Sequence, residues 1–301
     1  ESNQADVPMD AASLAQRLRG KRGVVCSLTD RIDCELLKHC AELKVVANIA
    51  VGYNNIDLAA CRAAGVMVTN TPGVLDDSTA DLAWTLMLAA ARRLTEVEAR
   101  VRGGEWRGWH LKQWLGVDVH HATLGIIGMG RIGQVIARRA AGFEMRVIYH
   151  NRNRLAPAVE QKLNAVYASK DELFAQSDFI VLQVPYSLET HHLIGEAELR
   201  KMKAGAILIN STRGGVVDDA ALIRALKSGV IRAAGLDVYE NEPKINPEFL
   251  ELKNVVLAPH IGSSTEATRR AMAMTAARNA VAALSGAIPP NLVDPAPLAV
   301  R

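Results

Sequence analysis

Short apolar runs rich in Val and Ile alternate along the chain with longer stretches that have the apolar spacing of helices. Such runs, bounded by turn residues, are typical of strands buried on both faces of a parallel sheet with crossover helices. The pattern predicts nine strands, at Gly23 to Ser27, Val45 to Ile49, Val66 to Thr69, Thr123 to Gly128, Arg146 to Tyr149, Phe179 to Leu182, Ala206 to Asn210, Ala233 to Leu236 and Val255 to Leu257. Nine strands are too many for one small sheet, so we expect an α/β protein with more than one.

Two long Ala-rich helices are expected where the chain passes between domains. The first, Thr79 to Arg93, follows the turn residues Thr71 to Gly73, which suit a domain crossing. Its candidate N-terminal capping residues are Asp76, Asp77 and Ser78. The second helix, Thr265 to Leu284, has no strand behind it, so it can return to the first domain.

We therefore expect two Rossmann-like α/β domains with parallel sheets. A cofactor domain of residues 72–262 would be inserted into a substrate domain made of residues 1–71 and 263–301, with the active site in the cleft between them. A chain of 301 residues is long enough for both domains to bury their own cores. Closure of the cleft would exclude water from the reaction.

Charge and cysteine usage restrict the expected partners and compartment. The 35 basic and 32 acidic side chains are spread along the whole chain, so we expect a small ligand and neither nucleic acid nor membrane as a partner. Cys26, Cys34, Cys40 and Cys61 form no CxxC pair and are expected to be buried thiols in a reducing cytosol. No apolar run approaches the roughly 20 residues of a bilayer span, and no signal core follows a basic stretch, so we expect a cytoplasmic protein. Because the first residue is Glu1, the printed chain is expected to begin inside a longer natural sequence.

A glycine motif between a strand and a helix indicates a dinucleotide site. In TLGIIGMGRIGQ, Gly128 permits a tight turn, Gly130 lets a pyrophosphate approach the backbone, and Gly133 lets helix and strand pack closely. The N-terminus of the helix would then present free N–H groups to the phosphates.

The end of the next strand favours NADP(H) over NAD(H). Sites for NAD usually have an Asp or Glu about 20 residues after the glycines, to bind the ribose hydroxyls. Here the segment is HNRNR, in which Asn151, Arg152 and Arg154 carry no negative charge, and a guanidinium matches a 2′-phosphate. Simple solvated loop cations are the alternative interpretation, and NAD(H) stays a second cofactor.

Three later segments suit the reduction of a 2-oxo acid. NSTRGGVVDD, LDVYENEP and APHIGSST each follow an apolar strand, so all three are expected at the ligand-binding edge of the sheet. Arg213 can hold the substrate carboxylate and polarise the carbonyl, while His260 can protonate the new alkoxide as hydride arrives. A carboxylate would orient the imidazole, and we assign it to Glu242, with the neighbouring Glu240 as the alternative.

These motifs, in this order, resemble the D-isomer-specific 2-hydroxyacid dehydrogenase family over almost the whole chain. The resemblance implies a catalytic Arg-Glu-His set at Arg213, Glu242 and His260, and a homodimer. It also implies that Arg131 and Ile132 contact the pyrophosphate of the cofactor. Thr212 would lie at the ribose side and Asp237 at the nicotinamide amide. We also expect Gly262 to be a cofactor-binding residue. The segment AVGYNNID implies that the N–H groups of Val51 and Gly52 hold the substrate carboxylate.

Other conspicuous residues receive weaker assignments. Asp218 and Asp219 are expected to start the helix Ala220 to Lys227. The pairs His120–His121 and His191–His192 have no metal-ligand spacing, so we expect no metal and assign them no role. The tryptophans of one loop-like stretch suit a subunit contact or plain core packing, and one of them, Trp109 or a neighbour, is a candidate to reach the partner's substrate pocket. They are Trp106, Trp109 and Trp114.

The resulting hypothesis is an NAD(P)-dependent 2-oxo acid reductase that uses NADPH and forms the D-2-hydroxy acid. Glyoxylate and hydroxypyruvate rank first as substrates, with 2-ketogluconate close behind. The alternative is a dinucleotide-sensing, corepressor-like binding protein of the same fold. Turnover of NADPH, as opposed to nucleotide binding without turnover, separates the two.

Overall fold

The computed structural model describes residues 1–5 and 7–293, and the chain divides into two compact units. The larger unit is Asp76–Ser263, and the smaller consists of Glu1–Leu75 together with the described part of Ser264–Arg301. The first crossing follows residue 75 where the sequence suggested 71, and the second follows residue 263 where it suggested 262.

The larger unit is built on a seven-stranded sheet in the order β10-β9-β8-β7-β4-β5-β6, in which every pair of neighbours is parallel. Its strands are β4 Thr123–Ile127, β5 Arg146–His150, β6 Ala165–Tyr167, β7 Phe179–Leu182, β8 Ile207–Asn210, β9 Ala233–Leu236 and β10 Val255–Leu257. From β4 the chain winds outward through β5 and β6 on one side and from β7 to β10 on the other. The reversal between β4 and β7 is the position where doubly wound sheets bind ligands, at the carboxyl ends of the strands.

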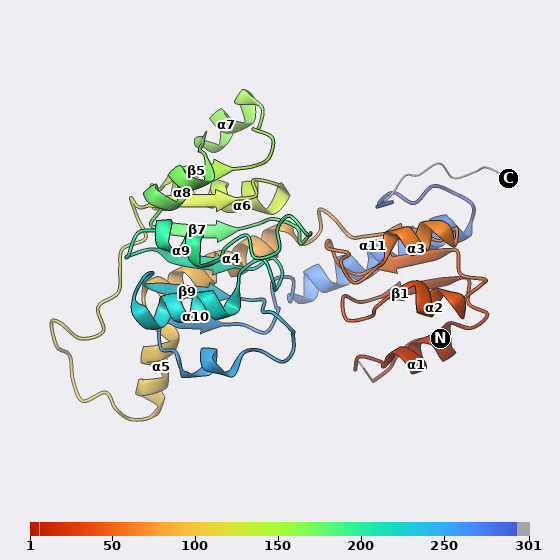
Figure 1. Ribbon diagram of the computed structural model, residues 1–301, viewed down its shortest axis with the longest axis horizontal. Helices are drawn as coiled ribbons and strands as arrows, with labels where there is room; N and C mark the ends of the chain where they lie inside the picture. Colours follow the sequence, from red (N-terminus) through yellow and green to blue (C-terminus); the bar gives the residue numbers. More distant parts are fainter. Residues whose placement is uncertain (6, 294–301) are drawn as a thin grey trace. The chain divides into compact units, whose positions relative to one another are not determined.

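Helices cover both faces of this sheet (Figure 1). One apolar cluster joins α4 and α6 to the sheet, and a second joins α8, α9 and α10 to its other face. The helical segments are α4 Asp76–Ala91, α5 Leu94–Arg102, α6 Arg131–Ala140, η1 Ala141–Phe143, α7 Pro157–Leu163, α8 Lys170–Gln176, α9 Glu196–Lys201, α10 Asp219–Ser228 and η2 Pro247–Glu251. In β4, Gly125 lets α8 lie close to the sheet, because a Cβ there would overlap the side chains of Leu173 and Ser177.

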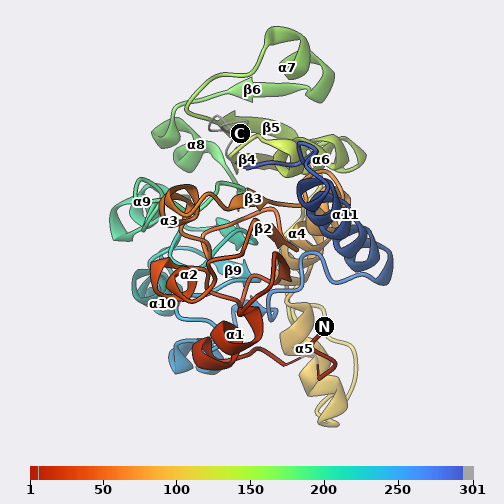
Figure 2. The same cartoon turned by 90° about the vertical axis from the view of Figure 1, so that its right-hand side faces the viewer.

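The smaller unit has a three-stranded parallel sheet in the order β1-β2-β3 (Figure 2). Its elements are α1 Ala11–Leu18, β1 Gly23–Cys26, α2 Cys34–Lys38, β2 Val45–Asn48, α3 Leu58–Ala63, β3 Met67–Thr69 and α11 Glu266–Leu284. Alternate residues of β2 face opposite sides. Val46 joins the cluster formed with α1, α2 and α3, whereas Val45 and Ala47 pack against alanines of α11.

The predicted α/β class with parallel sheets is confirmed, and each of the nine predicted strands is present with bounds shifted by at most one residue. The sequence analysis missed β6, because this strand has only three residues and Val166 within it is 54% exposed. The proposed capping residues of α4 also need correction. Because α4 already begins at Asp76, Asp76, Asp77 and Ser78 lie in its first turn, where the two carboxylates favour the positive helix end.

The cysteines are all free thiols, as predicted, but one is not buried. Cys26, Cys40 and Cys61 are buried, and burial raises the pKa of Cys26 to about 12 and that of Cys61 to about 11. Cys34 is exposed because it opens α2 at the surface, which corrects the expectation for this residue.

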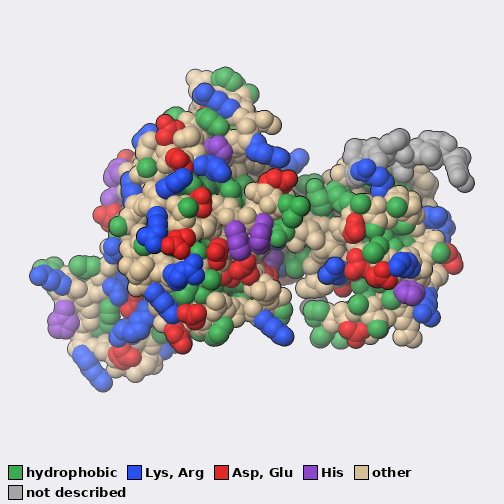
Figure 3. Space-filling model, viewed as in Figure 1, with side chains coloured by type: hydrophobic (Ala, Val, Ile, Leu, Met, Phe, Trp, Pro, Cys, Tyr) green, Lys and Arg blue, Asp and Glu red, His purple; other side chains and the backbone are tan. Residues whose placement is uncertain are grey.

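The surface carries both signs of charge. On the face that Figure 3 shows, Lys and Arg side chains are interspersed with Asp and Glu. Within the described residues, no helix combines the length and apolar character that a membrane crossing requires.

Candidate active site

Three loops of the larger unit carry the candidate catalytic residues. Arg213 follows β8, Glu242 follows β9 and His260 follows β10. These strands are neighbours in one parallel sheet, so their carboxyl ends lie at the same edge. The glycine loop after β4 lies at that edge too.

His260 and Glu242 form a direct pair. The imidazole Nδ1 lies 2.8 Å from Glu242 Oε2, and the two side chains are 24% and 29% exposed. Since the ionised carboxylate accepts, we assign the proton of this bond to Nδ1. No hydrogen bond to Nε2 occurs among residues 1–5 and 7–293, so this nitrogen is free to act on a ligand.

The surroundings of Glu242 keep it ionised. Burial on its own would raise the pKa of this carboxyl. The hydrogen bond with His260, the bond from the Tyr239 N–H to Oε1 at 2.8 Å and the charges of His260 and Arg213 outweigh burial, so the pKa lies below its usual value. An anionic Glu242 accepts from Nδ1 and so orients the imidazole.

Arg213 is the cation of the cluster. Its guanidinium is largely withdrawn from water and donates from Nη1 to the Thr212 carbonyl at 2.6 Å. Burial lowers the Arg213 pKa, and the nearby charge of Glu242 opposes this effect. An arginine nevertheless keeps its positive charge at neutral pH. Arg213 therefore interacts electrostatically with Glu242 of the Glu242–His260 pair.

Asp237 holds the loop that carries His260. Its carboxylate accepts the N–H of Ile261 at 2.7 Å and that of Gly262 at 2.9 Å, while its carbonyl accepts the N–H of His260 at 2.9 Å. His260 adopts a left-handed conformation with φ of 57°, which a non-glycine residue keeps only when its surroundings impose it. Asp237 and Gly262 therefore shape the loop, and their predicted contacts with the nicotinamide stay predictions.

Asn210 and Gly214 bring the Arg213 loop against the Glu242 loop. Asn210, at the end of β8, accepts from the Thr212 hydroxyl at 2.7 Å and donates to the Arg213 carbonyl at 3.3 Å. A Cβ on Gly214 would overlap the carbonyl oxygen of Tyr239, so only glycine allows the two backbones to lie this close. The sequence analysis did not assign Asn210. A polar residue ending an apolar strand was the signal for it.

The competing carboxylate, Glu240, has a different partner. It lies 2.6 Å from His192 Nε2, and its N–H donates to Asp219 at 3.0 Å. The geometry therefore pairs Glu242, and not Glu240, with His260, as the sequence analysis assigned. Asp218 caps α10 as expected, and in the described part of the chain no cluster of His, Cys, Asp or Glu is arranged to hold a metal.

The glycine loop has the shape that a pyrophosphate requires. Gly128 has a φ of 100°, and a Cβ on Gly133 would overlap the Gly128 carbonyl. Above Gly130, by contrast, a Cβ would meet nothing within 4 Å, so the space beside this backbone is open. Gly130 also precedes α6, whose first turn begins with Arg131 and Ile132 and has no side-chain cap. These features fit a dinucleotide phosphate.

The two arginines after β5 differ in their surroundings. Arg154 makes two hydrogen bonds of 2.8 Å to Glu160, whereas Arg152 has no hydrogen bond or ion pair within the described ranges. Asn151 accepts the N–H of Met129 at 2.6 Å and so links this loop to the glycine loop. The sequence analysis gave Arg152 and Arg154 the same role, and it did not identify Glu160.

The predicted carboxylate-binding residues Val51 and Gly52 lie in the smaller unit, after β2. Their carbonyls accept from Asn70 and Asn48, each at 2.9 Å. No hydrogen bond within residues 1–5 and 7–293 uses their N–H groups, so these remain available to an anion.

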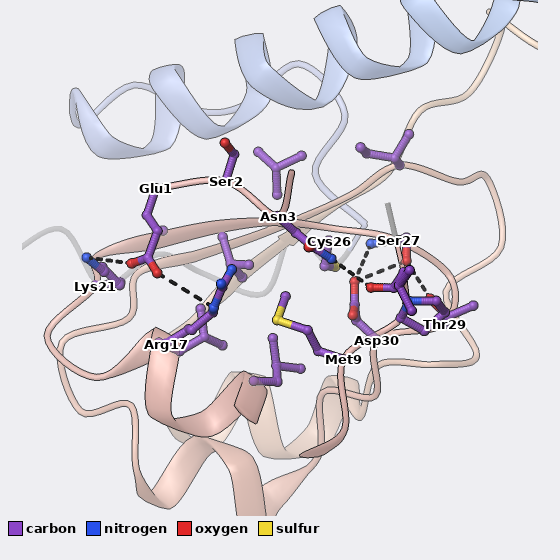
Figure 4. Close-up of a pocket in the computed structure, with 18 residues that line it drawn as sticks. Glu1, Ser2, Asn3, Met9, Arg17, Lys21, Cys26, Ser27, Thr29 and Asp30 are labelled. Atoms are coloured by element: carbon purple, nitrogen blue, oxygen red, sulfur yellow. Dashed lines mark hydrogen bonds and ion pairs between the residues drawn. The ribbon is translucent and has the colours of Figure 1, made fainter. Parts of the chain in front are cut away.

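The smaller unit also contains a hollow of about 640 Å³ between α1 and β1 (Figure 4). Apolar groups such as Met9 line it together with Arg17, Cys26 and Asp30. None of the predicted site residues belongs to the lining of this hollow, which is therefore separate from the candidate catalytic loops.

A family model described as the D-isomer-specific 2-hydroxyacid dehydrogenase NAD-binding domain matches residues 84–262, the stretch that contains the glycine loop and all three catalytic loops. The chain belongs to this dehydrogenase family. It is therefore an NAD(P)-dependent oxidoreductase, and the larger unit contains its nicotinamide-dinucleotide domain.

Relatives and solved structures agree with this membership. The chain is 52% identical over 285 residues to a glyoxylate reductase of Thermococcus litoralis. The alignment covers 93% of this chain and 86% of the relative. A glyoxylate reductase structure from Paecilomyes thermophila is 39% identical, with a TM-score of 0.86 over 94% of this chain and 87% of the other. An NADPH-dependent glyoxylate/hydroxypyruvate reductase of Sinorhizobium meliloti, solved with NADP and malonate, is 33% identical, with a TM-score of 0.85 over 94% and 87%.

Proposed function

We propose that the dehydrogenase reduces a small 2-oxo acid to the D-2-hydroxy acid with NADPH, with glyoxylate and hydroxypyruvate as first-ranked substrates and 2-ketogluconate next. The observation that carries the proposal is the Glu242–His260 pair with the buried guanidinium of Arg213 near it. The names of the similar reductases support this substrate class.

In this mechanism each residue has one task. Arg213 binds the substrate carboxylate and polarises the carbonyl oxygen, on which negative charge develops. His260 donates a proton from Nε2 to that oxygen, and Glu242 stabilises the imidazolium before the transfer. A reduced nicotinamide, when held by the glycine loop, would supply the hydride to the carbonyl carbon. The C=O bond thus gains one hydride and one proton and becomes CH–OH.

The cofactor contacts follow the two loops. The N–H groups at the start of α6, in Arg131 and Ile132, bind the pyrophosphate, and Thr212 and Asp237 serve the ribose and nicotinamide side. Asn151 and Arg152 would hold the 2′-phosphate, with Arg152 as the cation. The absence of an acidic side chain at this position supports NADPH over NADH, because a carboxylate would repel the phosphate.

The N–H groups of Val51 and Gly52 are proposed to hold the substrate carboxylate as well. Their freedom from protein acceptors supports this role. Gly52→Pro, which removes one N–H, is expected to raise the KM for glyoxylate more than it lowers kcat. An unchanged KM would exclude Gly52.

We propose a homodimer whose contact includes the segment from α5 to Leu115. Apolar side chains are exposed there, with Trp106 at 55%, Trp109 at 76%, Leu111 at 75% and Leu115 at 59%. Exposed tryptophans of this kind anchor protein interfaces. Light scattering should give twice the chain mass, and Trp109→Glu should reduce it to the monomer, whereas a wild-type monomer would contradict the proposal.

A substrate panel tests the proposed activity. Glyoxylate, hydroxypyruvate and 2-ketogluconate are each supplied with NADPH and with NADH, and the oxidation of the cofactor is followed by its absorbance. We expect turnover of glyoxylate and hydroxypyruvate with NADPH preferred, and D-glycerate from hydroxypyruvate. Tight nucleotide binding without turnover of any 2-oxo acid would favour the corepressor-like alternative.

A further inference from the structure

We propose that Glu160 is a positioning residue for cofactor choice: it pairs with Arg154 and fixes the 151–155 loop, so that Arg152 alone reaches the 2′-phosphate. The inference rests on the proposed use of NADPH. It assigns different roles to Arg152 and Arg154, which the sequence alone does not distinguish.

Arg154 has a carboxylate partner in the protein, although its side chain is 62% exposed. Its Nε donates to Glu160 Oε1 and its Nη2 to Oε2, each at 2.8 Å, in the two-pronged geometry of the strongest arginine–carboxylate pairs. The guanidinium also lies 5.7 Å from the centre of the Tyr167 ring. The Glu160 carboxylate offsets the positive charge of Arg154, so the pair attracts a phosphate less strongly than an unpaired guanidinium does.

Glu160 is a buried charge with a built environment. Only 10% of its side chain is exposed, and it accepts a third hydrogen bond, from the Tyr149 hydroxyl at 2.6 Å. The hydrogen bonds from Arg154 and then from Tyr149 hold the pKa of Glu160 below its ordinary value. Burying a carboxylate costs free energy unless the charge is paired. The Glu160 carboxylate is therefore stabilised by its ion pair with Arg154.

Hydrogen bonds of Tyr149 and Tyr167 fix the 151–155 loop at both ends. At the far end, the Tyr149 hydroxyl accepts the N–H of Leu155 at 2.9 Å. At the near end, the Tyr167 hydroxyl donates to the Asn151 carbonyl at 3.3 Å, and the Asn151 side chain accepts from Met129 of the glycine loop at 2.6 Å. The backbone on either side of Arg152 is therefore fixed before a cofactor binds.

Arg152 is the cation that this frame presents. It has no hydrogen bond or ion pair in the described part of the chain, although it stands two residues from an arginine that has several. A fixed backbone lowers the entropy that is lost when a side chain closes on its ligand. Loosening the frame should therefore weaken the contact made by Arg152 even though Glu160 itself never touches the cofactor.

The test is the sign of the effect of Glu160→Ala on NADPH binding. The dissociation constants of NADPH and NADH are measured by fluorescence titration on the full chain without substrate. If Glu160 fixes the loop, the variant should bind NADPH about five- to tenfold more weakly, with NADH affected less than about twofold. If Arg154 were instead a phosphate ligand restrained by Glu160, releasing it would leave NADPH binding unchanged or make it tighter, which would overturn the inference.

A double-mutant cycle sharpens the result. Arg152→Ala should weaken NADPH about tenfold in the wild-type background and clearly less in the Glu160→Ala background, because Arg152 is no longer oriented there. Equal losses in both backgrounds would contradict the coupling. Glu160→Gln, which keeps hydrogen-bonding atoms in place, should restore part of the affinity, and this rescue excludes general misfolding.

The control is a carboxylate–arginine pair of the same unit that is remote from the loop. Glu196 lies 2.7 Å from Arg200 on the surface of α9, and Glu196→Ala should change neither dissociation constant. Failure of the proposed function has a different signature. A wild-type protein without preference for NADPH would overturn both proposals, whereas a preference that survives Glu160→Ala overturns only this one.

Discussion

Two carboxylates of the larger unit each hold a nitrogen-bearing side chain at 2.8 Å, and the two pairs differ in the groups that they leave without a partner. Glu242 binds one nitrogen of His260, so that the other imidazole nitrogen stays available among the described residues. Glu160 binds two nitrogens of Arg154 and also the Tyr149 hydroxyl. Among the described residues, the first pair leaves the imidazole Nε2 without a hydrogen bond, whereas the second pair uses both carboxylate oxygens and two nitrogens of the guanidinium.

We assign different roles to the two pairs: Glu242 and His260 act in the reaction, and Glu160 and Arg154 fix a loop. A catalytic pair must orient a group and leave one position for substrate. A structural pair in a buried setting must satisfy its charges, because an unpaired buried charge is strongly destabilising. Saturation of the hydrogen bonds, more than the residue types, separates the two pairs.

The largest effect in the catalytic pair's surroundings is expected from Arg213→Gln. The variant keeps hydrogen-bonding atoms but loses the positive charge that stabilises the developing alkoxide, so kcat/KM for glyoxylate should fall about 10³-fold. Steady-state kinetics with NADPH measures this loss. A decrease of less than about tenfold would remove Arg213 from the reaction.

Glu242→Gln should have the next largest effect, about 10- to 100-fold on kcat, because a neutral amide orients the imidazole without stabilising its charge. The wild-type carboxylate has a lowered pKa, so it stays ionised until the pH falls below the ordinary value of 4.5. Steady-state kinetics with NADPH near neutral pH measures the loss, and a wild-type kcat in the variant would contradict the pairing.

A smaller effect, on stability alone, is expected at Asp219, which accepts the Glu240 N–H in the loop leading to Glu242. Burial raises the Asp219 pKa from 3.8 to about 6, and the charges of Glu240 and Asp218 add to this, while the Glu240 N–H and His192 oppose it. A raised carboxyl pKa contributes stability below about pH 4, which is lost as the pH rises through 6.

Asp219→Asn keeps an acceptor for this N–H and does not ionise. Above pH 6 the variant should therefore be more stable than the wild type by about 1 kcal/mol, and the difference should shrink toward pH 4. Urea unfolding at pH 4.5 and pH 7.5 measures it. Equal differences at both pH values would show that ionisation of Asp219 has no part in the effect.

The sequence predicted those parts of the molecule that depend on local pattern. Nine strands follow from apolar runs, and the three catalytic segments follow from polar residues placed directly after such runs. The strand β6 was missed although β3 and β10, which are equally short, were predicted; it differs from them in that its middle residue, Val166, is 54% exposed. The partner of Arg154 was missed for another reason. Glu160 reaches Arg154 only through the turn between β5 and α7, and no spacing rule predicts that geometry.

The most direct test of the central claim is the single-turnover reduction of glyoxylate by His260→Gln, measured by stopped flow beside the dissociation constant of NADPH. The account predicts that the chemical step slows by about 10²- to 10⁴-fold while the NADPH dissociation constant changes less than twofold. A chemical step that keeps its wild-type rate, or a parallel loss of NADPH binding, would contradict the role of His260 as the proton donor.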